Sequence, residues 1–154
     1  MSRLRGVLAA SSFLAVLSCR GGPLPASLAG TWTGRDKVGV RVQDPRGGPR
    51  FVSDTVAISL TIDADGRAKG YVGGAVLENA YVVRNRGWFG RRLHIGTDFR
   101  LEGRLQGHLF AADPIPTKDV LAPFDLRGDT LAGGLAQRVR MGIYPMVLLR
   151  LPRR

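Results

Sequence analysis

The chain has 154 residues, a formal net charge of +11 and one cysteine. This length suits one domain with its own core rather than two, and a lone cysteine excludes a framework of intrachain disulfides. The charge excess is almost entirely arginine, with 20 Arg and 3 Lys against 10 Asp and 2 Glu. Most arginines stand singly in different segments, without a basic helix or a run of stacking aromatics. This spacing argues against nucleic-acid binding and is compatible with attraction to an anionic membrane surface.

The first 19 residues have the parts of an export signal. Arg3 and Arg5 precede an apolar run from Val7 to Leu17, and a small residue, Ser18, stands before Cys19. A run of eleven residues suits a secretory signal peptide, whereas a membrane-spanning helix needs about 20. The ending Ala-Val-Leu-Ser-Cys resembles the lipobox of bacterial lipoproteins. That resemblance implies removal of residues 1–18 and acylation of Cys19; ordinary secretion is the alternative.

The lipobox resemblance also implies an address. Cys19 would carry a covalent lipid, the only cofactor we expect, and would anchor the protein to a membrane of the bacterial cell envelope. Arg20 follows the cysteine, and the absence of aspartate there indicates the outer membrane in the sorting rule of that family. Loss of Arg3 and Arg5 reduces the net charge from +11 to +9. The next residues are rich in Gly and Pro, so we expect residues 19–29 to be the lipidated cysteine and a flexible tether.

From Gly30 onward the pattern is that of β-strands. Residues 56–62 alternate apolar with small or polar side chains, residues 63–66 read as a turn, and residues 67–72 return as a partner strand. The same construction recurs over residues 99–111 and 124–136 as a weak repeat. Further strands are predicted at residues 75–84, 91–95 and 145–151, and one helical turn at residues 117–121.

This pattern predicts an all-β fold: a single antiparallel up-and-down β-barrel of eight to ten strands over residues 30–154. Closure removes the exposed edges that sequential hairpins would otherwise leave. A membrane-spanning barrel would need segments of about ten residues with aromatic girdles at both ends. The predicted strands are shorter and aromatic residues make up only 7% of the chain. We therefore expect a soluble barrel held by the lipid.

Two short motifs resemble those of lipocalins and related small barrels. Gly30-Thr31-Trp32 resembles the Gly-x-Trp opening of that family, and Thr97-Asp98-Phe99 resembles its Thr-Asp-Tyr element with phenylalanine for tyrosine. The resemblance implies a lipocalin-like barrel in which Trp32 packs across the closed end beneath an arginine of the last strand. Arg150, the one charge in residues 145–151, is the predicted partner. The chain departs from the family in its spacings and in lacking a long C-terminal helix.

The sequence offers little catalytic or metal-binding chemistry. His94 and His108 are the only histidines and have no ligand-type residue beside them at metal-site spacing, so we predict no metal site. Asp63 and Asp65 resemble the start of a calcium loop, but Val72 stands where its glutamate would be needed, which favours a turn. No nucleophile motif occurs, so no catalytic residues are assigned and we expect a protein that is not an enzyme. A hydrolase assembled from distant residues is the remote alternative.

Four aromatic residues are the candidate ligand or rim contacts: Tyr71, Tyr81, Trp88 and Phe89. On the inner face or rim of a barrel they would line an apolar pocket, whereas ordinary packing is the alternative. Trp88 and Phe89 lie between glycines, as in an exposed loop that could be a lid, a partner contact or a membrane-touching wedge.

We therefore expect a non-enzymatic envelope lipoprotein that binds a small apolar or amphipathic ligand inside the barrel. The alternative is an envelope scaffold with a filled barrel, which acts through its surface on a protein partner. A large void inside the barrel would favour the carrier, and a filled interior would favour the scaffold. An eight-stranded barrel is just wide enough for either.

Overall fold

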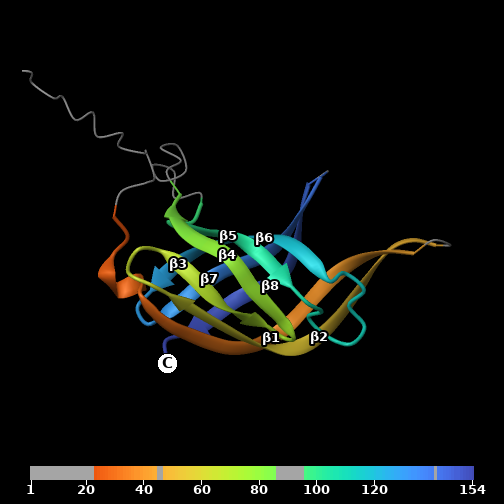
Figure 1. The fold of residues 1–154 in the computed structure, drawn as a ribbon, viewed down its shortest axis with the longest axis horizontal. Helices are drawn as coiled ribbons and strands as arrows, with labels where there is room; N and C mark the ends of the chain where they lie inside the picture. Colours follow the sequence, from red (N-terminus) through yellow and green to blue (C-terminus); the bar gives the residue numbers. More distant parts are fainter. Residues whose placement is uncertain (1–22, 45–46, 86–95, 141) are drawn as a thin grey trace, which may run out of the picture.

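The computed structural model describes residues 23–44, 47–85, 96–140 and 142–154. Its strands form one sheet in which each is antiparallel to the next along the chain (Figure 1). A short 3-10 helix, η1 (Ala26–Leu28), precedes them. The eight strands are β1 (Gly30–Asp44), β2 (Gly48–Ile62), β3 (Arg67–Val72), β4 (Ala75–Arg84), β5 (Phe99–Gln106), β6 (Thr117–Arg127), β7 (Thr130–Val139) and β8 (Gly142–Pro152).

The last strand returns beside the first and nearly closes the sheet. The main-chain N–H of Arg154 donates to the carbonyl of Thr31 at 2.9 Å. Further along β1, a Cβ added to Gly34 would lie 2.9 Å from a methyl group of Leu151 on β8. Glycine at this position therefore lets the two strands approach. The prediction of an all-β, up-and-down antiparallel barrel is confirmed, with eight strands, and a lipocalin-like architecture is consistent with it.

Side-chain alternation builds the core. Along β6, Lys118, Val120, Ala122 and Phe124 are buried, whereas the residues between them are partly or fully exposed. The same period of two holds over residues 56–62 of β2 and along β3, because successive side chains of a strand point to opposite faces of the sheet. Phe99 on β5 stacks on Phe124, with ring centroids 5.6 Å apart. Burying each large apolar side chain stabilises the fold by about 1.5–3 kcal/mol.

Two local predictions have opposite outcomes. Residues 63–66 form the predicted turn: the N–H of Gly66 donates to the carbonyl of Asp63, and Gly66 has a φ of 85°, which glycine adopts without strain. The predicted helical turn over residues 117–121 is wrong, because these residues belong to β6. Pairing with both β5 and β7 provides the main-chain hydrogen bonds that a helix would otherwise supply.

The segment before β1 is part of the folded unit. Leu28 is buried in the core and Leu24 packs against it. The guanidinium Nε of Arg84 on β4 donates to the carbonyl of Pro23 at 3.1 Å. The prediction of a flexible tether through residue 29 is therefore wrong for Leu24 and Leu28, because these side chains pack on the barrel. Cys19 lies outside the described residues.

The strand predicted at residues 91–95 also lies outside the described residues. Among the residues that the structure does describe, no helix is long and apolar enough to cross a membrane.

Candidate functional site

Trp32 closes one end of the barrel. It lies on the inward face of β1 and its side chain is fully buried. The indole N–H donates to the carbonyl of Leu28 at 3.2 Å, which ties η1 across this end. The guanidinium of Arg153 lies over the ring, 4.8 Å from its centroid. The closed end beneath an arginine therefore exists, as the sequence motif suggested.

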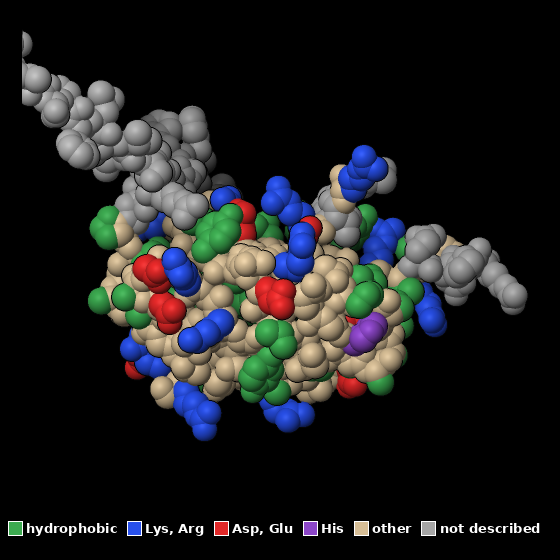
Figure 2. All heavy atoms as spheres, viewed as in Figure 1, with side chains coloured by type: hydrophobic (Ala, Val, Ile, Leu, Met, Phe, Trp, Pro, Cys, Tyr) green, Lys and Arg blue, Asp and Glu red, His purple; other side chains and the backbone are tan. Residues whose placement is uncertain are grey.

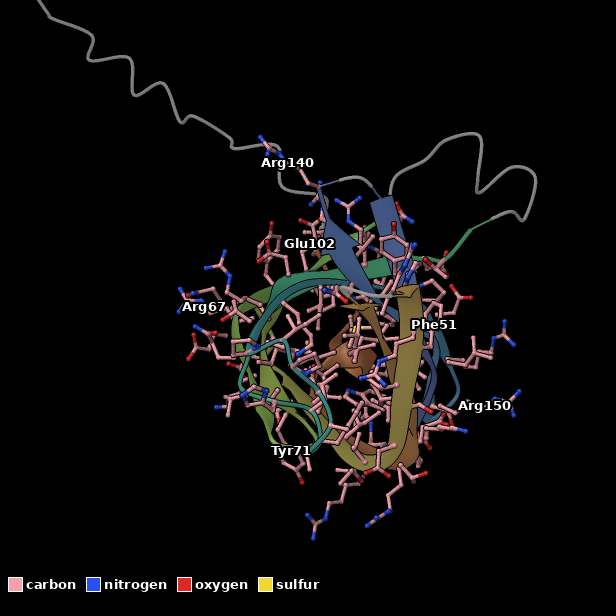
Figure 3. The ribbon with its side chains drawn as sticks, turned by 90° about the vertical axis from the view of Figure 1, so that its right-hand side faces the viewer. Phe51, Arg67, Tyr71, Glu102, Arg140 and Arg150 are labelled. Atoms are coloured by element: carbon pink, nitrogen blue, oxygen red, sulfur yellow. The ribbon has the colours of Figure 1, made fainter. Side chains whose placement is uncertain are left out.

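The predicted partner of Trp32 is wrong. Arg150 is exposed and projects away from the barrel (Figure 3), because Leu149 and Leu151 on either side of it are buried in the core. With a period of two, a side chain between two inward-facing leucines must face outward. Arg153 follows the end of β8 and can therefore turn back over the indole. Its guanidinium also donates to the carbonyl of Ser27, next to η1.

The opposite end is closed by the loop between β5 and β6. Leu109 in this loop is buried in the core, and its carbonyl accepts the N–H of Gly74 from the turn between β3 and β4. A Cβ added to Gly73 in that turn would lie 1.9 Å from the carbonyl oxygen of Leu109. The turn and the loop are thus held in direct contact across this end.

A buried ion pair fixes the same loop. The ammonium of Lys118 lies 2.6 Å from Oδ2 of Asp113, and both side chains are fully buried. Asp113 also accepts the main-chain N–H of Leu109 at 2.8 Å and that of Ile115 at 3.1 Å. The lysine donates in addition to the carbonyl of Ile115. Each charge thus has the hydrogen bonds that burial demands.

Between these two closures the interior is filled. A cavity lined mostly by core residues has a volume of about 30 Å³. Its lining includes Ile58, Leu60, Leu77, Leu101 and Leu149. For comparison, an apolar cavity of about 150 Å³ binds a molecule as small as benzene. This cavity therefore has space for water-sized molecules and not for a lipid-like ligand.

The predicted ligand contacts are not brought together inside the barrel. Tyr71 on β3 and Tyr81 on β4 are on the outer face, with exposed fractions of 45% and 47%. The hydroxyl of Tyr81 donates to Glu102 of β5 at 3.1 Å, also outside. The prediction of an inner pocket lined by these rings is wrong for Tyr81, because Val82 beside it takes the inward position. Tyr71 is among the residues around the cavity of about 30 Å³, but it is 45% exposed and Val72 beside it takes the inward position. Trp88 and Phe89 lie outside the described residues.

An open hollow of about 370 Å³ lies over the β5–β6 loop. Its lining comprises Gly74, His108, Leu109, Phe110, Ala111 and Asp113. Nδ1 of His108 is 2.6 Å from the main-chain carbonyl of Asp113, so the imidazole serves to hold the loop. His94 lies outside the described residues. Among those described, no three His, Cys, Asp or Glu side chains gather into a group that could hold a metal ion.

The second family-like motif also has a structural role. Phe99 stacks in the core, and the N–H of Asp98 donates to Oδ1 of Asp125 at 2.7 Å. The hydroxyl of Thr97 donates to the carbonyl of Phe99 at 3.1 Å. The motif thus starts β5 and joins it to β6.

Sequence reasoning missed Arg153, Asp113 and Lys118. Lys118 carried a usable signal, because it continues the alternation of Val120, Ala122 and Phe124 as a charged residue in an inward position. Asp113 is in a loop, where no periodicity reveals which way a side chain points. Comparisons with protein families, with curated proteins and with solved structures found no match for this chain.

Replacing Arg153 by alanine should reduce the free energy of unfolding by about 0.5–2 kcal/mol, since it removes the cation over the Trp32 ring. Arg150→Ala is the matched control. It removes an exposed arginine three positions earlier and should change stability by less than about 0.5 kcal/mol. Urea denaturation of both variants measures the difference. Equal losses of unfolding free energy, or a larger loss for Arg150→Ala, would contradict the assignment of Arg153 as the partner of Trp32.

Lys118→Met should cost about 3–5 kcal/mol, because it leaves the Asp113 carboxylate buried without its cation. A second change, Asp113→Asn in the Lys118→Met background, should recover part of the loss by removing the buried charge. Arg104→Met is the control: it breaks the exposed Arg104–Asp119 pair, 2.9 Å apart, and should cost less than about 1 kcal/mol. If urea denaturation gives equal losses of unfolding free energy for Arg104→Met and Lys118→Met, a special role for the buried pair is refuted.

Proposed function

We propose that this protein is a non-enzymatic lipoprotein of the bacterial cell envelope that acts through the outer surface of a filled barrel. The filled interior carries the proposal. Core side chains leave a cavity of about 30 Å³, and Trp32 with η1 at one end and the β5–β6 loop at the other cover the core. Of the two functions that the sequence left open, this arrangement favours the scaffold over the carrier of an internal ligand.

The outer wall supports an interaction role. Several large apolar side chains are exposed on it, with Leu148 the most exposed at 79%. Exposed apolar groups on a soluble domain are typical of contact sites when they lie together. Figure 2 shows that basic and acidic side chains are dispersed over the face in view rather than gathered into one charged patch. A surface of this kind is better suited to a partner of low charge than to a polyanion.

The environment of His108 supports a role without catalysis. A hydrolytic triad needs a histidine between a nucleophile and a carboxylate. Here Nδ1 of His108 meets a main-chain carbonyl, and both oxygens of the Asp113 carboxylate accept main-chain N–H groups. These contacts use His108 and Asp113 to fix the loop.

The anchor at Cys19, as proposed from the lipobox, would hold the barrel close to the membrane. Leu24 packs on the barrel, so the chain available as a tether ends near Pro23. Four residue steps from Cys19 to Pro23 span at most about 14 Å when fully extended. The Trp32 end of the barrel would therefore be beside the lipid head groups, closer than a ten-residue tether would allow.

Cys19→Ala should release the protein from membranes, because it removes the acylated side chain. Cell fractionation followed by detection of the protein measures this. Metabolic labelling with a fatty acid should mark the wild-type chain and should not mark Cys19→Ala. Ser18→Gly, which keeps a small residue before the cysteine, is the control and should stay membrane-bound. A Cys19→Ala protein that still sediments with membranes would contradict the anchor.

The released Cys19→Ala protein, purified without detergent, should have the same mass under native and denaturing conditions. A filled barrel has no room for a co-purifying apolar molecule. Native mass spectrometry measures this directly. An additional mass that disappears on denaturation would overturn the filled-barrel proposal and restore the carrier.

A further inference from the structure

An apolar block lies on the outer wall of the barrel, over the three neighbouring strands β6, β7 and β8. Its members occupy outward positions in adjacent rows of these strands, and none has a polar atom in its side chain. The most prominent is Leu148, which is 79% exposed, whereas Leu149 beside it is buried. We call this the apolar block; its members are Leu121 and Pro123 on β6, Ala132, Gly134 and Ala136 on β7, and Leu148 on β8.

The middle strand keeps this face from bulging. The wall of a barrel is convex, so outward side chains on three successive strands ordinarily form a crest over the middle one. On β7 the outward side chains of the block are two methyl groups and a hydrogen atom, whereas the strands on either side carry leucine and proline. The small residues lower the centre of the face, and the larger ones raise its sides. A second sheet can therefore lie close against β7.

Gly134 is not required by the fold of a single copy. Its φ is not positive, and a Cβ added to it would lie 3.6 Å from the carbonyl oxygen of Val147, which is an ordinary contact. The neighbouring Gly133 differs, because a Cβ there would lie 2.2 Å from the carbonyl oxygen of Pro123. Alanine and glycine are poor strand formers, and glycine inside a strand is typical of a site where another main chain approaches closely. Close approach of a second surface would account for Gly134.

We propose that the apolar block is the contact between two copies of this chain, related by a two-fold axis that runs along β7. Rotation about this axis lays β7 of each copy on β7 of the other and sets β6 opposite β8. Leu148 of one copy then faces Pro123 of the other, and the two Gly134 residues face each other. Contact of one patch with its own copy is the commonest arrangement in homo-oligomers.

The charges at the edge of the block fit this axis. Register places Asp125 on β6 and Arg150 on β8 on either side of Ala132. Because the axis sets β6 opposite β8, Arg150 of each copy faces Asp125 of the other, and this pair forms twice. Arg150 projects away from its own barrel, as this contact requires (Figure 3). An axis across the strands at Gly134 would instead set Asp125 against the apolar Leu121, at a cost in desolvation.

The size of the block predicts weak association. Three strands and three rows cover about 14 Å by 20 Å, on the order of 300 Å² per copy, whereas a standard stable interface buries about 800 Å² per partner. The axis along β7 also points the Trp32 ends of both barrels in the same direction. Two copies held through Cys19 can therefore meet within one membrane, where confinement raises their effective concentration.

This inference rests on the proposed function in that it names the partner of the outer wall, but association itself requires neither the lipid nor the export signal. Retention of Cys19→Ala in membranes would contradict the anchor and leave the dimer intact. Lack of association would contradict the dimer and leave the anchor intact. In a native mass spectrum, a dimer has twice the mass of the chain and is thereby distinguished from a bound small molecule.

The test is sedimentation equilibrium of the Cys19→Ala protein over about 1–300 µM, a range that suits a weak contact. We expect a reversible equilibrium between monomer and dimer. Gly134→Lys and Leu148→Lys should stay monomeric at the highest concentration, since each places a charge at the centre of the contact. Arg150→Glu should weaken the dimer several-fold, because it sets two carboxylates opposite each other. Circular dichroism checks that the variants are folded.

Val76→Lys is the matched control. Val76 is 53% exposed on β4, outside the apolar block, so its replacement should leave the dimer unchanged. In the Cys19→Ala background, Gly134→Cys should be joined to a second copy by a short bismaleimide, and Val76→Cys should not. Denaturing electrophoresis measures this for soluble and membrane-bound protein alike.

The proposal is overturned if the protein is monomeric throughout and Gly134→Cys does not cross-link. A dimer that persists unchanged in Gly134→Lys, Leu148→Lys or Arg150→Glu would also overturn it, because the contact would then lie elsewhere. Loss of the dimer in Val76→Lys alone would assign association to the opposite wall.

Discussion

The width of an eight-stranded barrel constrains everything else in this molecule. Such a barrel is just wide enough to be filled by the inward side chains of its own strands or to hold one small ligand. When those side chains are Ile, Leu, Val and Phe, as in β2, β5 and β6, they fill it. Function then depends on what the ends and the outer wall present. The two ends are occupied by closures, which leaves the wall as the surface open to partners.

The two ends of the barrel core are covered by different kinds of side chain. At one end, Trp32 covers the core with a large apolar ring, and its single N–H is satisfied by Leu28. At the other, Asp113 and Lys118 bring two charges into the interior, where main-chain groups complete their hydrogen bonds. A buried ion pair adds little net stability compared with apolar residues, but it accepts only one loop geometry. The indole therefore supplies burial, and the ion pair fixes how the loop lies.

The fold could be predicted from the sequence because alternation and turn residues are local signals. Strands β2 and β3 and the turn at Gly66 lie where the pattern over residues 56–72 placed them. Facing could be predicted too, and alternation alone would have put Arg150 outside, between Leu149 and Leu151. The resemblance to a family motif predicted Arg150 over Trp32 instead, because a family pattern gives the partner's residue type and not its position in the chain. Leu24 and Leu28 were misread because Gly and Pro mark a loop without showing whether the loop is packed.

Side-chain facing also explains why the two tyrosines predicted as ligand contacts lie on the outer face of the barrel. Tyr71 and Tyr81 were predicted as ligand or rim contacts of the barrel, but a sequence taken strand by strand does not show which outward residues become neighbours. Register does: it places Tyr71 between Ser59 and Val76, and Tyr81 between Arg67 and Glu102. Two tyrosines of nearly equal exposure thus have different surroundings, uncharged for Tyr71 and charged for Tyr81. A contact surface on a sheet runs across the strands and combines residues that are tens of positions apart in the sequence. Its chemistry can therefore be predicted only when the pairing of the strands is known.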